Sequence, residues 1–131
     1  MKSTVEIDIE ASPVIVVRYP DTVAVEDFEP LFRRFAEICG SVQRVGWVID
    51  LRAFNPVTAS ATSRKAFTDA FKRYRHVIEP ATVCEARVIE STLTRGIATA
   101  VDWMRAKKFE AKNFGDFDSA KAWVTATVAR A

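Results

Sequence analysis

Residues 45–51, with the sequence Val45-Gly46-Trp47-Val48-Ile49-Asp50-Leu51, form a nearly continuous apolar run that closes on a carboxylate. A strand with one face in water alternates apolar and polar side chains, whereas an unbroken apolar run indicates a strand that is buried on both faces. Strands of that kind occur inside parallel sheets that helices cover on both sides. The run therefore predicts the central strand of an α/β domain.

Two strands and a helix are predicted before this central strand. Residues 4–9 alternate between polar and apolar side chains, and residues 14–19 form a β-branched run. The short polar break between them indicates an antiparallel hairpin. Between Val25 and Cys39 the apolar residues recur at helical spacing, and we expect Gly40 to end that helix.

Helices and strands alternate after the central strand. In order, the sequence predicts a helix over 58–78 stopped by Pro80, a strand over 82–89, a helix over 91–104, an edge strand over 109–114, and a last helix capped by Asp116 or Asp118. The full order is β-β-α-β-α-β-α-β-α. We therefore expect an α/β fold with a single mixed, largely parallel sheet of about five strands and four helices, in one domain spanning residues 1–131.

The composition excludes several classes of protein. The formal net charge is only +2, a weaker basic excess than nucleic-acid binding predicts. The four glycines are scattered, so a glycine-rich phosphate loop is absent from the sequence. One histidine and two cysteines, without a Cys-x-x-Cys motif, are too few for a zinc site. We therefore expect neither a cofactor nor a metal.

The sequence also bears on the compartment. Met1-Lys2-Ser3 leads directly into acidic residues, unlike the apolar stretch of a secretory signal peptide. No apolar run approaches the roughly 18 residues that a transmembrane segment requires. Two cysteines without an export signal fit a reducing compartment, so we expect a cytoplasmic protein.

Two phrases of the sequence are similar to those of a known family. Gly46-Trp47-Val48-Ile49-Asp50-Leu51-Arg52 is similar to an apolar central strand that closes on Asp before a loop and a helix. Phe114-Gly115-Asp116-Phe117-Asp118-Ser119-Ala120-Lys121-Ala122-Trp123-Val124 is similar to an aromatic edge strand with an acidic cap and an Ala-x-x-Trp helix. In this order, and over nearly the whole chain, they resemble the SpoIIAA-like family of small bacterial proteins in the STAS superfamily of anti-sigma-factor antagonists.

The resemblance implies a binding role. Better understood relatives use the loop and helix after the central strand to dock a partner protein, and some switch by phosphorylation of a hydroxyl there; related CRAL-TRIO domains enclose a lipid. The Asp-Ser-Ser-Gly-like switch motif is not reproduced, because Asp50 is followed by Leu51-Arg52-Ala53. Thr58 and Ser60 lie near the corresponding helix start, either as phosphosites or, more commonly for such hydroxyls, as helix caps.

The candidate partner-binding residues are polar or aromatic side chains of this loop and helix. They are Asp50, Arg52, Phe54, Asn55, Arg64 and Arg73. Asp50 ends a central strand, where open α/β sheets bind ligands, but an Asp there also caps the turn that follows. Phe54 either folds back on the core or offers an anchor to a partner.

Groups suited to catalysis are scarce. His76 is the only histidine and lies among Lys72, Arg73 and Arg75, and Glu79, three residues on, is the one nearby carboxylate in the sequence that could orient its ring. The two cysteines fall at positions predicted to be buried. We therefore expect no enzyme but a regulatory or scaffold domain that binds a protein partner through the loop and helix after the central strand.

Two further expectations concern a small ligand and self-association. The alternative function is a carrier of a small molecule or lipid, with a pocket between the sheet and the helices that begin near Thr58 and Ser91. A homodimer is also expected, because the first hairpin and the edge strand over 109–114 would leave backbone groups unpaired.

Overall fold

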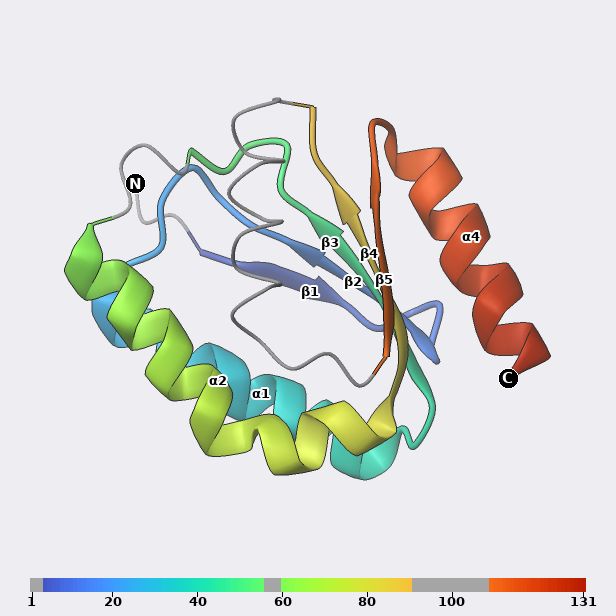
Figure 1. Cartoon of the computed structure of the whole chain (residues 1–131), viewed down its shortest axis with the longest axis horizontal. Helices are drawn as coiled ribbons and strands as arrows, with labels where there is room; N and C mark the ends of the chain where they lie inside the picture. The colour runs from blue at the N-terminus through green and yellow to red at the C-terminus, as the bar shows by residue number, and fades with distance from the viewer. Residues whose placement is uncertain (1–3, 56–59, 91–108) are drawn as a thin grey trace.

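Five strands form one sheet in the order of the chain, β1-β2-β3-β4-β5 (Figure 1). A computed structural model describes residues 4–55, 60–90 and 109–131 of the protein. The strands are β1 (Glu6–Asp8), β2 (Val14–Arg18), β3 (Val45–Asp50), β4 (Thr82–Val88) and β5 (Glu110–Phe114). β1 is antiparallel to β2, and the other neighbours are parallel. The predicted mixed, largely parallel sheet is confirmed, with β3 at its centre.

Helices cover both faces of the sheet (Figure 1). On one face lie α1 (Phe28–Ser41), preceded by the 3-10 turn η1 (Val25–Asp27), and α2 (Ala61–Ala81); on the other lies α4 (Phe117–Arg130). The helix predicted over 91–104 falls outside the described residues. The α/β class and the order of the described elements agree with the prediction.

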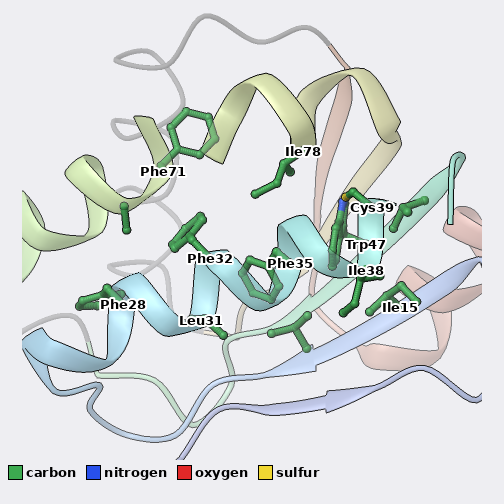
Figure 2. Close-up of a cluster of buried hydrophobic side chains, with 13 residues drawn as sticks. Ile15, Phe28, Leu31, Phe32, Phe35, Ile38, Cys39, Trp47, Phe71 and Ile78 are labelled. Carbon is green, nitrogen blue, oxygen red and sulfur yellow. The ribbon is translucent and has the colours of Figure 1, made fainter. Parts of the chain in front are cut away.

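The larger core lies between the sheet and the helices α1 and α2 (Figure 2). Aromatic rings fill it with edge-to-face contacts, such as Phe32 to Phe35 at 5.3 Å and Phe35 to Trp47 at 5.2 Å between centroids. The Trp47 indole N–H donates to Thr82 Oγ1 at 3.0 Å, and that hydroxyl donates to the carbonyl of Ile78 at 2.7 Å. These bonds satisfy the polar atoms of the buried tryptophan and threonine.

The second core lies under α4 and depends on a glycine. Val14, Val16 and Val48 of the sheet pack with Val124 of α4. A Cβ atom added to Gly46 would lie 2.5 Å from methyl carbons of both Val124 and Val128, closer than carbon atoms pack. Gly46 therefore lets α4 approach β3.

Caps and helix ends follow the prediction with small shifts. The Ser60 hydroxyl accepts the Ser63 N–H at 3.0 Å, and the Asp116 carboxylate accepts the Ser119 N–H at 2.9 Å, so both residues cap their helices. α1 runs through Gly40 to Ser41 because Gly40 keeps a negative φ. α2 runs one residue past Pro80, to Ala81, so the helix ends next to the proline that was expected to stop it.

Candidate functional site

The carboxyl ends of the parallel strands place charged side chains side by side. Arg18 ends β2 and lies opposite Asp50, which ends β3; Glu90 follows β4 by two residues. The Tyr19 N–H donates to the Asp50 carbonyl at 3.0 Å, and the Leu51 N–H donates to the Val88 carbonyl at 3.0 Å. The sheet hydrogen bonds thus continue just past the strands and hold this edge in place.

Asp50 is the centre of an ion cluster. Its side chain is buried, and Arg52 binds it with two parallel hydrogen bonds, Nε to Oδ1 at 3.0 Å and Nη2 to Oδ2 at 2.8 Å. The Arg52 backbone N–H also donates to Oδ1 at 3.1 Å, and Arg18 Nε lies 3.7 Å from Oδ2. Asp50 therefore holds the turn that follows β3, which agrees with the turn-cap interpretation of its position.

The electrostatics of the cluster keep Asp50 ionised. Burial alone would raise the pKa of the Asp50 carboxyl, but the hydrogen bonds from Arg52 and the charges of Arg52 and Arg18 outweigh burial and lower that pKa below its ordinary value. The hydrogen bond to Asp50, together with the nearby charges of Glu90 and Asp118, raises the pKa of Arg52. At neutral pH the carboxylate is a fixed anion whose oxygens already accept hydrogen bonds.

Both arginines also contact the first residue of α4. The guanidinium carbon of Arg18 lies 5.0 Å, and that of Arg52 5.7 Å, from the centre of the Phe117 ring. The side chains of Arg18 and Arg52 remain 41% and 38% exposed. The site therefore presents two partly exposed guanidinium groups that a carboxylate and an aromatic ring hold in place.

Arg18 and Phe117 were not among the predicted site residues. A signal for Arg18 was present, because it ends the strand predicted beside the central one, and parallel strands end at the same edge. Phe117 was assigned only to the last helix, and its contact with two arginines depends on how α4 crosses the sheet.

The loop after β3 folds against the segment after β2. The Phe54 ring meets the Tyr19 ring edge-on, with centroids 6.0 Å apart, and the Asn55 N–H donates to the Asp21 carbonyl at 3.0 Å. Phe54 is half-buried, so it folds back on its neighbours and still shows part of its surface. The predicted residues Asp50, Arg52, Phe54 and Asn55 thus form one continuous stretch at the strand ends.

An open hollow of about 410 Å³ lies beside this stretch. It is lined by Tyr19, Asp50, Arg52, Ala53 and Glu90. A charged, wide hollow of this kind differs from the apolar, enclosed pocket that most small molecules occupy.

The predicted residues on α2 lie apart from the ion cluster. Arg64 is exposed in the first turn of α2. Arg73 lies further along the helix and its Nη1 is 3.7 Å from Glu29 of α1, whose carboxylate also accepts the Tyr74 hydroxyl. Arg73 lies on α2, which covers one face of the sheet, whereas Arg52 contacts Phe117 of α4, which covers the other face. The structure therefore does not bring Arg73 and Arg52 together.

Of the two candidate phosphosites, the structure describes Ser60. The Ser60 hydroxyl accepts from the Ser63 N–H and donates to the Ser63 hydroxyl at 3.2 Å, in an exposed position. Thr58 lies outside the described residues.

Other reactive groups have structural positions. Burial raises the pKa of the Cys39 and Cys84 thiols to about 11, so both are protonated at neutral pH. Among residues 4–55, 60–90 and 109–131, no group of three or more His, Cys, Asp or Glu side chains could hold a metal ion. The same part of the chain contains no helix with the length and apolarity to cross a membrane.

A family model for SpoIIAA-like proteins matches residues 14–125. The chain belongs to the SpoIIAA-like family. The structure of this SpoIIAA-like protein is similar to the crystal structure of an uncharacterised DUF3478-family protein with a SpoIIAA-like fold from Shewanella loihica PV-4. The TM-score is 0.68 over 95% of this chain and 98% of that chain; at 14% identity, the likeness shows the fold alone. No curated protein matches the chain.

Proposed function

We propose that this SpoIIAA-like protein is a non-enzymatic regulatory or scaffold domain that binds a protein partner through the strand-end surface. We define that surface as Arg18, Tyr19, the stretch Asp50–Asn55 and Phe117. The observation that carries the proposal is the pair of partly exposed arginines held against Asp50 and Phe117. Arginine and aromatic side chains are enriched among the residues that dominate protein interfaces.

The fixed geometry of the arginines supports binding. A flexible arginine loses rotamer freedom when a partner immobilises it, which costs on the order of 1 kcal/mol. Here Arg52 is already bound at both oxygens of Asp50, so much of that freedom is lost before a partner arrives. A preorganised arginine keeps more of the contact free energy for affinity.

The charges around the surface indicate the chemistry of the partner. Arg18 and Arg52 are positive, and Glu90 and Asp118 lie close enough to Arg52 to affect its pKa. A matching partner would present a carboxylate toward the arginines and a basic side chain toward Glu90, with an apolar group against the exposed part of Phe54.

The state of the reactive groups supports binding rather than catalysis. Asp50 is ionised with its oxygens engaged by Arg52, so it is poorly suited to donate or accept a proton at neutral pH. Both thiols are protonated and buried, so they are poor nucleophiles.

Affinity capture with the purified chain tests the proposal. We expect Arg52→Ala and Phe54→Ala to lose the same captured proteins that the wild type retains, when capture is measured by quantitative mass spectrometry. Arg130→Ala, at the exposed end of α4, is the matched control and should retain them. Thermal unfolding of each variant checks that it is folded. Identical capture by all four proteins would contradict the proposed surface.

The carrier function is the weaker candidate. The layer between the sheet and the helices α1 and α2 is filled by aromatic and aliphatic side chains. Where β4 faces that side, Arg87 Nε lies 2.8 Å from Glu85 Oε2, and such an ion pair disfavours an apolar ligand. Native mass spectrometry after mild extraction distinguishes the two functions. A carrier would retain the added mass of a bound small molecule or lipid, and a partner-binding domain would not.

A further inference from the structure

The outer edge of β5 carries backbone groups that point away from the sheet. In the described part of the chain, β5 pairs only with β4. The Phe114 carbonyl accepts the Ile89 N–H at 2.8 Å, so the peptide groups of Phe114 face β4. Because these directions alternate along a strand, the N–H and C=O groups of Ala111 and Asn113 face outward. Within the described ranges, no strand pairs with these outward groups.

The side chains that flank Ala111 carry opposite charges. Glu110 and Lys112 are exposed and lie on the α4 face of the sheet, since their partners Cys84 and Ala86 contribute to the core under α4. If two copies of β5 pair antiparallel about Ala111, Glu110 of each copy lies opposite Lys112 of the other. The two ion pairs occupy positions without direct backbone hydrogen bonds, where opposing side chains are closest.

The other edge of the sheet lacks this complementarity. β1 carries Glu6 and Asp8 as its exposed side chains, and antiparallel self-pairing about Ile7 would place these two acids opposite each other. Like charges in opposing positions are destabilising and protect an edge from self-pairing. Charge therefore favours self-pairing at β5 and opposes it at β1.

We propose that two copies of this chain associate through β5, which pairs antiparallel with β5 of the second copy about a two-fold axis at Ala111. The axis is perpendicular to the sheet, so both α4 helices lie on the same face of one continuous sheet. Half-buried Trp123, whose ring centre is 5.7 Å from that of Phe114, lies next to the shared edge and adds apolar area. The contact is self-complementary, so it closes at a dimer.

Charge variants at β5 test the dimer, with the mass measured by light scattering and the affinity by analytical ultracentrifugation. We expect wild type to form a dimer at high concentration. E110K and K112E each place like charges opposite each other, so each should weaken the dimer by on the order of ten-fold. The double variant E110K/K112E and an equimolar mixture of the two single variants restore opposite charges and should recover dimerisation.

A proline variant tests the backbone pairing. Ala111→Pro removes an N–H that faces outward and leaves the hydrogen bonds to β4 intact, so it should abolish the dimer while the monomer stays folded by circular dichroism. A wild type that remains monomeric at every concentration, or a dimer that persists in the folded Ala111→Pro variant, would overturn the proposal. Glu37→Lys, an equal change of charge at an exposed residue of α1 away from both sheet edges, is the matched control and should not weaken the dimer.

Discussion

At the scale of single residues, Asp50 links three parts of the molecule. Its carboxylate accepts from the backbone and side chain of Arg52, lies near Arg18, and holds both arginines beside Phe117. The position was predicted from the sequence because an acid at the end of an apolar strand is a local feature. Its arginine partners were not predicted together, since Arg18 and Arg52 belong to different elements.

Replacing Asp50 with Asn should destabilise the protein by about 1–3 kcal/mol, because charge-assisted hydrogen bonds are lost and two arginines remain close together. Urea denaturation at pH 7 measures the loss. Glu37→Gln, at an exposed carboxylate on α1, is the control and should stay within about 0.5 kcal/mol of wild type. Equal stability of Asp50→Asn and wild type would contradict the assigned role.

The lowered pKa of Asp50 predicts that the stability of the protein depends on pH. Because the pKa of Asp50 is lower in the folded state, its contribution to stability is complete above the ordinary value of 3.8 and is lost as pH falls through the lowered value. The difference in stability between wild type and Asp50→Asn should therefore shrink below about pH 4. A constant difference from pH 7 to pH 2 would show that the pKa of Asp50 is not lowered by folding.

The hydrogen bond between Trp47 and Thr82 provides a third prediction at this scale. Trp47→Phe removes the donor to the buried Thr82 hydroxyl, and Thr82→Val removes the acceptor. A double-mutant cycle measured by urea denaturation should give a coupling energy of about 1 kcal/mol. Additive effects would show that the hydrogen bond does not contribute to stability.

At the scale of elements, the contact between α4 and β3 depends on the absence of a side chain. Gly46 lies in the apolar run that predicted β3, but its role under α4 was not predicted, because the sequence does not say which strand a distant helix crosses. The predicted caps of α2 and α4 were correct at Ser60 and Asp116, since capping needs only neighbours along the chain.

Two glycines should respond oppositely to alanine. Gly46→Ala places a methyl group against Val124 and Val128 and should cost about 1–3 kcal/mol. Gly40→Ala meets no atom within 4 Å and lies in α1, where alanine favours the helix, so it should stabilise by about 0.5–1 kcal/mol. Thermal or urea unfolding compares the two variants. A neutral Gly46→Ala would mean that α4 can move away from β3 without cost.

The cap of α2 gives another prediction at this scale. Ser60→Ala should lower stability by about 1 kcal/mol, because the Ser63 N–H loses its acceptor, whereas Ser60→Asp should retain the cap. Chemical denaturation compares the two variants. Loss of stability in both would show that the position requires more than a cap.

At the scale of the whole molecule, the sheet separates two cores, and each contains one cysteine. Cys39 lies in the core under α1 and α2, and Cys84 lies in the core under α4. Strands β2 and β3 contribute side chains to both cores, so neither layer can open without disturbing the shared strands. We expect the two cores to unfold as one cooperative unit.

Thiol labelling tests this cooperativity. Burial raises the pKa of both thiols to about 11, so in the folded protein each should react slowly at pH 8, where the thiolate fraction is on the order of 0.1%. Cys39→Ala and Cys84→Ala variants leave one thiol each, and both thiols should become reactive with the same denaturant midpoint once their stabilities are matched. Separate midpoints would indicate that one layer opens alone.

The order of the described strands and helices, the central position of β3 and the caps of α2 and α4 could be predicted from the sequence, because hydrophobic periodicity and capping depend on residues close together in the chain. Contacts between elements could not be predicted from the sequence. The meeting of Arg18, Arg52 and Phe117 at Asp50, the separation of Arg73 from that cluster and the close approach of α4 to Gly46 were established only by the tertiary structure. Each depends on how helices cross the sheet, and that geometry results from packing among residues far apart in the chain.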